Sequence, residues 1–314
     1  MPQSLVIGGS GFVGRTLVEQ LIARGEKVTV ISRRPPPSDA EWLALDITDA
    51  EALARALNGR QFDAMHHTAS LPGDTGNPEE MMRVNVAGLQ TLLEFARYSP
   101  SSRFVLTSSI SAHGWYPPTP YLEPLALPVG EDHPCWPRDM YCLTKRMQEE
   151  LALTYFHQFG VPVVILRLPS VMGPNASGGS QAWGDFARQA RAGGRVPVPM
   201  HSAEEINHYV DVRDVATAHI LAATVPQAVG EIFNIAGPKE ISGRELAEVI
   251  RQLIPASETY YADGWTSAQG HQLYFDIDKA ERILGYHPRY GVADSLRDML
   301  AAAETTAATS GGRP

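Results

Sequence analysis

The chain has 314 residues, a formal net charge of −9 and 44% hydrophobic residues. This length is enough for one large domain, or two closely packed ones, with a sizeable core. The negative charge argues against non-specific binding to nucleic acid or to an anionic membrane surface, so we expect neither partner. Two cysteines, Cys135 and Cys142, make neither a disulfide framework nor a metal-ligand pattern, so we expect no metal and a reducing, cytoplasmic location.

Apolar runs in this sequence are short. None approaches the roughly 20 residues that a membrane-spanning helix needs. The first one, residues 5–7, leads directly into glycines, so we do not expect it to be a signal peptide.

Strand-like and helix-like segments alternate through the first half of the chain. Apolar and β-branched runs predict strands at residues 4–7, 27–32, 63–68, 103–109 and 161–168. Helical spacing predicts helices at residues 15–24, 49–57, 78–98 and 140–159, the third with a proline near its first turn. This alternation predicts an α/β protein with a doubly wound parallel sheet, the Rossmann arrangement, covered by helices on both faces.

The segment 114–139 interrupts this alternation. It contains seven prolines and several aromatic residues, and it shows no periodicity. A loop of this length in a compact domain is usually functional or disordered. Because it leads directly to Tyr141, we interpret it as an ordered wall or lid of an active site, with a solvated insertion as the alternative.

The pattern becomes less regular after Leu168. Helices are predicted at 180–192, 209–223, 242–253, 278–284 and 293–303, with a strand at 232–235. We therefore assign residues 1–169 and 207–236 to the sheet domain, and residues 170–206 and 237–304 to a smaller, discontinuous C-terminal substrate domain. The small and polar residues 305–314 predict a disordered tail.

A glycine-rich turn separates the first predicted strand from the first predicted helix. Gly8 permits a tight turn, Gly11 lets the backbone approach a pyrophosphate, and Gly14 lets helix and strand pack closely. The N-terminus of the helix favours the negative charge of the phosphates. Glycine runs are common in turns, but this strand–turn–helix setting predicts a dinucleotide cradle made of Gly8, Ser10, Gly11, Phe12, Val13 and Gly14.

The end of the second predicted strand indicates which dinucleotide is bound. An acidic residue there would bond the ribose diol of NAD, but this chain has Ser32, Arg33 and Arg34. A hydroxyl and two guanidinium groups suit a 2′-phosphate, so we expect NADP(H) to be preferred. The alternative is that both arginines point to water, which leaves NAD(H) possible. Asp46 and Ile47 are expected to border the adenine, unless Asp46 only caps a helix.

Tyr141 and Lys145 stand four residues apart in a predicted helix and therefore on one face. The lysine, together with an oxidised nicotinamide, favours the phenolate, so we expect the pKa of Tyr141 to fall from about 10 toward the working range. Thr107, Ser108 and Ser109 end a predicted strand where it opens onto the ligand crevice, and a hydroxyl from this part of the chain is expected to orient the substrate oxygen. Tyrosine–lysine pairs at this spacing are common on helix surfaces, but this one follows a glycine turn and a hydroxyl-ended strand. The combination predicts hydride transfer between a nicotinamide and a carbon atom.

Over about residues 3–303 the sequence resembles the extended short-chain dehydrogenase/reductase family, also called the NAD-dependent epimerase/dehydratase family. Besides the glycine turn and the Tyr141/Lys145 pair, the resemblance includes residues 66–69, 85–88, 166–174, 209–216, 233–237 and 284–288. It implies that Ser109 is the catalytic hydroxyl, Tyr141 the acid/base and Lys145 its partner. It also implies that cofactor contacts come from His67, Thr68, Ala69, Thr107, Ser108, Leu168, Pro169, Ser170 and Val171, while Asn85 mainly braces the sheet. His66 is expected to be structural.

Three departures from the family pattern bear on the substrate. Nucleotide-sugar members often have an arginine where this chain has Asn207, an asparagine where it has Ser170, and Tyr-Gly where it has His113-Gly114. Arg188, Arg191 and Arg195 could bind an anion, but a solvated helix face is the simpler interpretation. We therefore expect a small hydroxy- or oxo-compound. The candidate substrate contacts are Ser70, Ser111, His113, Trp115, Met172, Asn175 and His208.

Three functions remain open on this basis. The first is an NAD(P)-dependent oxidoreductase that acts on a small sugar-like or oxo substrate, with Tyr141 as acid/base. The second is a nucleotide-sugar 4-epimerase or dehydratase with a tightly bound cofactor, and the third a cofactor-binding sensor without activity. By the resemblance, helices 78–98 and 140–159 are expected to form a homodimer interface.

Overall fold

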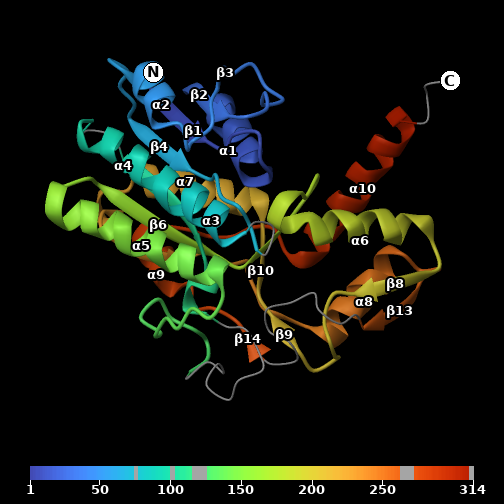
Figure 1. The fold of residues 1–314 in the computed structure, drawn as a ribbon. Coiled ribbons are helices and arrows are strands. Elements are labelled where there is room, and N and C mark those ends of the chain that lie inside the picture. Colours follow the sequence, from blue (N-terminus) through green and yellow to red (C-terminus); the bar gives the residue numbers. More distant parts are fainter. Residues whose placement is uncertain (74–76, 100–102, 115–125, 262–271, 311–314) are drawn as a thin grey trace.

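The computed structural model describes residues 1–73, 77–99, 103–114, 126–261 and 272–310, the last seven of these by backbone alone. Its centre is a seven-stranded sheet in the order β11-β6-β5-β4-β1-β2-β3, and every pair is parallel (Figure 1). The strands are β1 (Gln3–Ile7), β2 (Lys27–Ser32), β3 (Glu41–Ala44), β4 (Ala64–His67), β5 (Arg103–Ser109), β6 (Val163–Leu168) and β11 (Ile232–Asn234). This order is that of a doubly wound Rossmann fold with one added strand, which confirms the predicted fold class.

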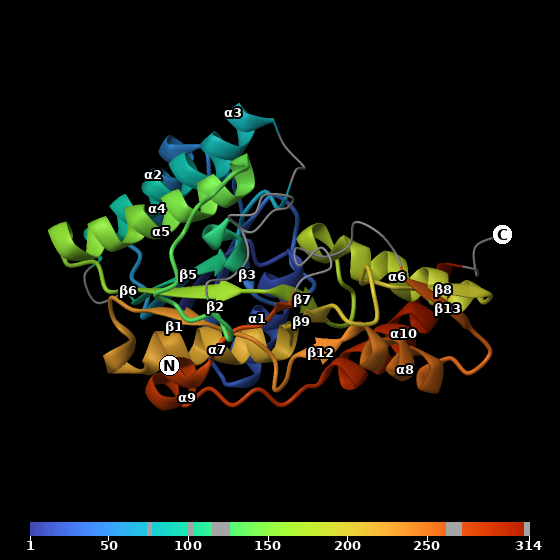
Figure 2. The same cartoon turned by 90° about the horizontal axis from the view of Figure 1, so that it is seen from below.

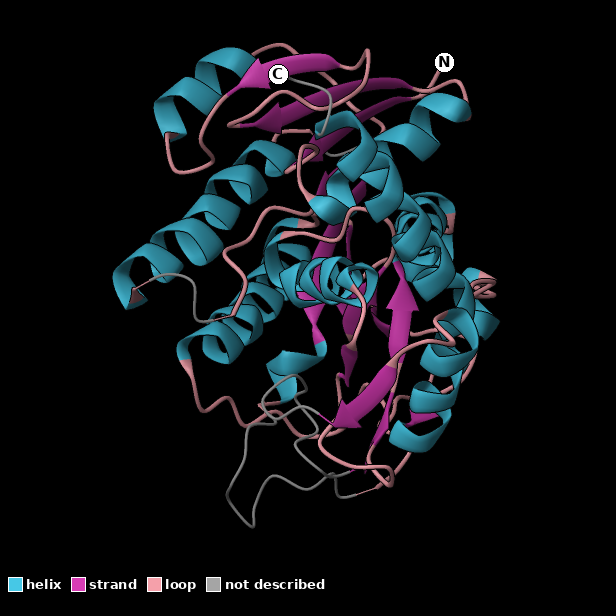
Figure 3. Ribbon diagram, turned by 90° about the vertical axis from the view of Figure 1, so that its right-hand side faces the viewer, coloured by secondary structure: helices cyan, strands magenta, loops and turns pink. Residues whose placement is uncertain are grey.

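Helices cover both faces of the sheet (Figures 2 and 3). One face carries α1 (Phe12–Ala23) and α7 (Val212–Thr224). The other carries α2 (Ala50–Leu57), α4 (Gly88–Arg97) and α5 (Met140–Phe159). Because both faces are covered, central strands such as β1 are apolar throughout, and Leu5, Val6 and Ile7 have no exposed surface. The edge strand β3 is largely exposed, and it is not among the strands predicted from the sequence.

The predicted helix 78–98 is continuous in space but not regular. It begins as α3 (Pro78–Met81), where the Asn77 side chain accepts a hydrogen bond from Glu80 N at 2.7 Å. It widens to a π-helix, η1 (Met82–Ala87), and continues as α4. Wide π turns of this kind often occur at functional sites.

A second lobe lies beside the sheet (Figure 2). It contains α6 (Gln181–Ala192), α8 (Gly243–Leu253), α10 (Val292–Ser310), and the paired strands β8 (Arg195–Val198) and β13 (Glu258–Tyr261). Small sheets connect it to the first part, namely β7 (Ser170–Met172) with β10 (Tyr209–Asp211), and β12 (Ile241–Ser242) with β9 (Ile206–Asn207) and β14 (Gln272–Leu273). Short 3-10 turns are η2 (Ile110–His113), η3 (Gly178–Ser180) and η4 (Pro226–Ala228).

Two segments differ from the predicted domain plan. Helix α9 (Asp278–Leu284) falls in the range assigned to the substrate domain, yet Lys279 Nζ donates to Ile232 O of β11 at 2.8 Å. Helix α10 continues to Ser310, so the prediction of a disordered tail from Thr305 is wrong for residues 305–310. Alanines are frequent from residue 301 onward, and alanine is the strongest helix former. The remaining domain boundaries stay a prediction.

None of the helices in the described part of the chain is long and apolar enough to cross a membrane.

Candidate active site

The glycine turn lies where β1 ends and α1 begins, beside the end of β4. Gly8 has a φ of +89°, which side chains disfavour, and a Cβ there would lie 2.8 Å from Ala69 N. A Cβ on Gly14 would lie 2.3 Å from Gly8 O, so α1 approaches the turn as closely as only glycine permits. A side chain at Gly8 or Gly14 would therefore collide with the backbone of the neighbouring segments.

This cradle fits a dinucleotide. Helix α1 has 12 residues, and its N-cap, Gly11, has no side chain to bond the first-turn N–H groups. The helix N-terminus thus offers backbone donors and a positive dipole end to a pyrophosphate. The turn also lies at the point where the strand order reverses, between β1 and β4, which is the usual ligand crevice of such sheets. A nicotinamide dinucleotide bound here supplies or accepts the hydride.

The residues predicted to select the cofactor stand at the end of β2. The Ser32 hydroxyl donates to Arg34 O at 2.6 Å, which fixes the turn, while both arginines are exposed. Asp46 Oδ1 accepts from Thr48 N at 2.9 Å and from the Thr48 hydroxyl at 2.8 Å. These hydrogen bonds and the positive charge of nearby Arg33 hold the pKa of Asp46 below its usual value, against the effect of burial, which is the largest single influence. Asp46 therefore braces the loop before α2, with the buried Ile47 next to it.

The end of β4 lies against the glycine turn. The Thr68 hydroxyl donates to Ile7 O at 2.9 Å, and Ala69 and Ser70 follow at partly exposed positions. The His67 ring, in contrast, is 1% exposed and packs on Phe104 with ring centroids 6.2 Å apart. Burial, with a smaller effect from the Lys145 charge, lowers the pKa of His67 to about 3. The His67 side chain is therefore a neutral core group. His66 is also fully buried and contacts His219, as expected for a structural residue.

Asn85 joins this loop to the catalytic helix. Its Oδ1 accepts from Leu71 N at 2.8 Å and from the Ser70 hydroxyl at 3.1 Å. Its Nδ2 donates to the Thr144 hydroxyl at 3.1 Å, and its backbone carbonyl oxygen accepts from Gln148 Nε2 at 2.6 Å. The predicted bracing role is thus visible, although what Asn85 braces is the loop after β4 and helix α5 rather than the sheet.

The predicted proton-transfer residues come together at the ends of β5 and α5. Asp139 caps α5 by accepting from Cys142 N at 2.8 Å, which places Tyr141 and Lys145 in the first turns of the helix. Ser109 ends β5 close enough to Tyr141 for its hydroxyl to lower the pKa of the phenol, although burial raises that pKa more strongly. Lys145 Nζ lies 5.9 Å from the centre of the Tyr141 ring and donates to Thr107 O at 3.1 Å. The Thr107 hydroxyl is paired with His219 Nε2 at 2.9 Å, so Thr107 meets Lys145 through its backbone.

The expected lowering of the Tyr141 pKa is not produced by the protein groups. Burial raises the pKa of Tyr141 to about 12, and the hydrogen bond from Ser109 opposes this only in part. Burial also lowers the pKa of Lys145 to about 8, so the ammonium that should favour the phenolate is itself poorly solvated. The protein alone therefore holds Tyr141 as a neutral phenol, a proton donor.

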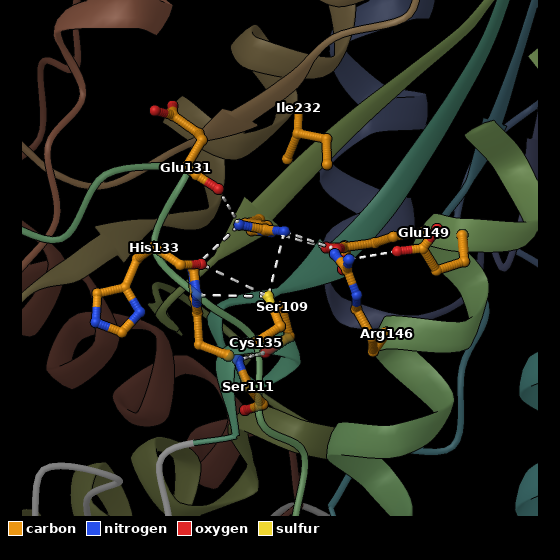
Figure 4. Close-up of polar contacts among 12 residues, drawn as sticks. Ser109, Ser111, Glu131, His133, Cys135, Arg146, Glu149 and Ile232 are labelled. Atoms are coloured by element: carbon orange, nitrogen blue, oxygen red, sulfur yellow. Dashed lines mark hydrogen bonds and ion pairs between the residues drawn. The ribbon is translucent and has the colours of Figure 1, made fainter. Parts of the chain in front are cut away.

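A buried ion pair joins α5 to β6 through Glu149 (Figure 4). Arg167 Nε and Nη2 donate to the two carboxylate oxygens of Glu149 at 2.9 and 2.8 Å, and both side chains are at most 1% exposed. The Ser108 hydroxyl donates to Glu149 at 2.7 Å, and Arg146 lies 3.3 Å from the same carboxylate. The prediction that Ser108 contacts the cofactor is therefore wrong for its side chain, which points to α5 and is 2% exposed.

Arg167 also contacts His113, which the sequence suggested as a substrate contact. Arg167 Nη1 lies 3.2 Å from His113 Nε2 and donates to Glu131 O at 2.9 Å. His113 has no exposed surface; burial, followed by the charge of Arg167, lowers its pKa to about 2. The 3-10 turn η2 after Ser109 directs this ring into the interior. His113 is thus a neutral acceptor in the core, and its assignment to the substrate is corrected.

The other predicted substrate contacts divide into three groups. Ser70, Ser111 and His208 lie in the part of the structure around the crevice, and Ser111 N donates to the Ser109 hydroxyl oxygen at 3.1 Å. Met172 is 1% exposed in the apolar core, which corrects that prediction, and Asn175 lines a separate cavity of about 560 Å³ between α6 and α10. Trp115 lies outside the described residues. Leu168, Pro169 and Val171 are buried, whereas Ser170 is exposed.

The Glu149–Arg167 pair is the main feature that sequence reasoning missed. A signal was present, because Tyr141, Lys145 and Glu149 recur at four-residue intervals and so share one helix face. Nothing in the sequence indicated that a strand residue of β6 would reach Glu149. The pairing depends on the register of β5 and β6, in which Ser108 lies opposite Arg167.

Comparison with known proteins agrees with this geometry. The model of the family described as NAD dependent epimerase/dehydratase matches residues 4–236. A UDP-glucose 4-epimerase from Halalkalibacterium halodurans is 28% identical over 320 residues, covering 93% of this chain and 92% of the relative. An epimerase structure from Methanothermobacter thermautotrophicus superposes with a TM-score of 0.84 at 25% identity, covering 98% of this chain and 94% of that one. The NAD complex of the UDP-glucose 4-epimerase from Thermus thermophilus superposes with a TM-score of 0.78 at 24% identity. This match covers 96% of this chain and 99% of that one.

A Rossmann fold with a glycine cradle and a Ser109–Tyr141–Lys145 site defines the class, an extended short-chain dehydrogenase/reductase. Within this class, the chain belongs to the NAD-dependent epimerase/dehydratase family.

Proposed function

We propose that the chain is an NADP(H)-preferring oxidoreductase that interconverts a carbonyl group and an alcohol in a small, sugar-like or oxo substrate. The observation that carries this proposal is the position of Lys145, whose Nζ lies 5.9 Å from the centre of the Tyr141 ring and donates to Thr107 O at 3.1 Å, two residues before Ser109. In the reductive direction Ser109 holds the substrate oxygen and Tyr141 donates its proton to that oxygen. Lys145 then favours the resulting phenolate by its charge, and water restores the proton.

A test of the net reaction distinguishes this proposal from a reaction in which hydride is taken and returned. Purified protein is incubated with NADPH and a panel of sugar-like and oxo compounds, and absorbance of the reduced nicotinamide is followed together with product. We expect one nicotinamide to be oxidised per carbonyl reduced. Turnover without added cofactor, and without net oxidation, would contradict the proposal.

A nucleotide-sugar 4-epimerase is the second candidate, and the names of several relatives favour it. It requires a cofactor that stays bound through purification. Stoichiometric nucleotide in the purified protein, together with conversion of UDP-glucose to its 4-epimer, would establish this function instead.

Cofactor choice is tested by Arg33→Ala. Arg33 and Arg34 are exposed at the end of β2, where a 2′-phosphate of NADP(H) would lie. Loss of one charged hydrogen bond should weaken NADPH binding about 10- to 100-fold and leave NADH binding within about twofold. Fluorescence titration measures both affinities. Arg24→Ala, at an exposed arginine after α1, is the matched control. If Arg33→Ala weakened the binding of NADPH and NADH equally, the proposed preference for NADP(H) would be contradicted.

The rate of carbonyl reduction should depend on pH through Lys145. Its pKa is lowered to about 8, so the ammonium is present below this value and is lost as the pH rises through it. Because the ammonium stabilises the phenolate that forms on proton donation, we expect kcat to fall above about pH 8. A Lys145→Met variant should be slow and lack this break. A wild-type profile that stays flat from about pH 7 to pH 9.5 would exclude this role.

We also propose a cytosolic homodimer through α3–α4 and α5. Leu89, Leu92, Leu93 and Ala96 of α4 are completely buried in the core and are not free to pair with a second copy. A stripe of Leu143, Met147 and Leu151 on α5 is at least partly exposed and better suited to pairing. Sedimentation equilibrium showing a single species of 34.2 kDa would contradict the dimer.

A further inference from the structure

An arginine of the π-helix η1 reaches the loop that follows β3. Arg83 Nη1 donates to the Thr48 hydroxyl at 2.7 Å, although 35 positions separate the two residues in the chain. Arg83 is exposed, so this hydrogen bond holds a guanidinium group at the surface and not in the core. Neither residue is among those that the sequence predicted to bind the cofactor.

The contact of Arg83 continues to Asp46. The Thr48 hydroxyl donates to Asp46 Oδ1 at 2.8 Å, and Thr48 N donates to the same oxygen at 2.9 Å. Burial is the largest single influence on the pKa of Asp46 and raises it, but the Thr48 hydrogen bonds and the charges of Arg33 and Arg83 together hold it below its usual value. Two arginines from different segments, the end of β2 and η1, therefore lie near one carboxylate.

The adenine of a bound dinucleotide would lie beside this carboxylate. With the pyrophosphate at the N-terminus of α1, the adenine ribose reaches the end of β2, which is the neighbour of β1 in the sheet. Adenine is attached to that ribose, so it would lie next to the end of β2. On the outer side β2 pairs with β3, and Ser32 lies opposite Ala44, two residues before Asp46. The loop 45–48 would thus form one wall around the base.

The helical run from α3 to α4 packs against the same loop. A Cβ on Gly88, the first residue of α4, would lie only 3.0 Å from Ile47 Cδ1. This run follows β4 in the chain, and the carboxyl end of β4 opens onto the ligand crevice, so the early residues of the run lie nearest to the crevice. Arg83 precedes Gly88 by five residues and is therefore on the crevice side of this contact. Its guanidinium group stands at the edge of the crevice, beside the loop 45–48.

We infer that Arg83 binds the adenine base, with its guanidinium group packed against the face of the ring, and that it strengthens the binding of NADPH and NADH alike. A guanidinium group is planar and weakly hydrated, and it stacks on aromatic faces by a cation–π interaction. The Thr48 hydroxyl and the charge of Asp46 hold the group in place before the base arrives. Arg83 thus differs from Arg33, which is proposed to distinguish the two dinucleotides. The inference needs only a dinucleotide in the glycine cradle, so it goes beyond the proposed substrate and the proposed preference for NADP(H).

The test measures equilibrium binding to Arg83→Met, which keeps an unbranched side chain and removes the guanidinium group. Titration gives the dissociation constants of NADPH, NADH, 5′-AMP and reduced nicotinamide mononucleotide, which has no adenine. We expect the three adenine nucleotides to bind more weakly by one common factor of about 3- to 10-fold, and the mononucleotide to be unaffected. Arg83→Lys should restore little, because an ammonium group has no planar face. Arg55→Met is the matched control, at an exposed arginine of α2 that pairs with Glu51 at 3.4 Å, and should change none of these constants.

A second variant distinguishes contact with the base from support of the loop. Thr48→Val breaks the same hydrogen bond but keeps the guanidinium group, so it should weaken the adenine nucleotides less than Arg83→Met does. Equal losses in the two variants would show that Arg83 acts only through the loop, and a loss confined to NADPH would assign it to the 2′-phosphate; either result overturns the inference. The proposed cofactor preference is tested separately, because equal loss of NADPH and NADH in Arg83→Met supports the inference even if Arg33→Ala shows no preference for NADP(H).

Discussion

Replacing Tyr141 with phenylalanine is expected to lower kcat by a factor of about 10² to 10⁴, the usual contribution of a positioned general acid. The change removes one oxygen atom from a ring that stays in place on α5. The hydroxyl that it removes is the group proposed to donate the proton. Affinity for NADPH, measured by fluorescence quenching, should remain within about threefold, because the glycine cradle and the end of β2 are unchanged.

A second tyrosine on the same helix provides the matched control. The Tyr155 hydroxyl donates to Glu94 Oε1 at 2.6 Å, 14 residues from the catalytic phenol and away from the crevice. Tyr155→Phe should cost about 1 kcal/mol of stability and leave kcat unchanged. Wild-type turnover in Tyr141→Phe, or an equal loss in both variants, would remove Tyr141 from the mechanism.

The largest expected effect on stability comes from Arg167→Met. This change leaves the Glu149 carboxylate buried without its bidentate partner, and removal of one member of a buried pair costs about 3–5 kcal/mol. That is a large part of the roughly 5–15 kcal/mol by which a domain of ordinary stability is folded. Urea denaturation followed by circular dichroism gives the free energy of unfolding. A loss below about 1 kcal/mol would show that Arg146, 3.3 Å from the same carboxylate, replaces the missing charge.

A double variant separates the pair from the site that it supports. In Arg167→Met/Glu149→Leu no charge is stranded, so much of the lost stability should return. Activity should not return to the same extent, because the Ser108 hydroxyl loses its acceptor on Glu149 and Ser108 directly precedes Ser109. Full recovery of both stability and kcat would show that the pair does not position the catalytic strand.

Family membership and substrate class rest on different parts of the molecule. The cradle, the hydroxyl-ended β5 and the Tyr141/Lys145 helix are features of the first 169 residues, and they define the family. A small pocket lined by Ile110, Trp183 and Phe275, among others, is formed mainly by the second lobe and the loops that lead to it. Several relatives bear the name UDP-glucose 4-epimerase, yet Asn207 of this chain hydrogen-bonds a buried glutamate. Similarity across the whole chain therefore supports an inference about the type of chemistry more strongly than an inference about the substrate.

Local pattern was sufficient where a function depends on adjacent residues. A few adjacent residues are enough to recognise the glycine turn, the Asp139-capped helix and the strand 103–109, because turn geometry and helical periodicity are local properties. The sequence therefore predicted the parallel sheet, the cradle and the Ser109–Tyr141–Lys145 site. Prediction failed for His113, Met172 and Ser108, whose side-chain directions depend on the 3-10 turn η2 and on the register of neighbouring strands.

By itself, then, the sequence determined the fold class and the family, and it predicted where the dinucleotide cradle and the Tyr141/Lys145 pair would lie. The tertiary structure decided which side chains lie in the core, the rise of the Tyr141 pKa and the Glu149–Arg167 pair. The physical reason is that burial and charge pairing arise between residues far apart in the chain, as Ser109 and Tyr141 or Glu149 and Arg167 are. Their energies depend on distances that exist only after the strands and helices have packed.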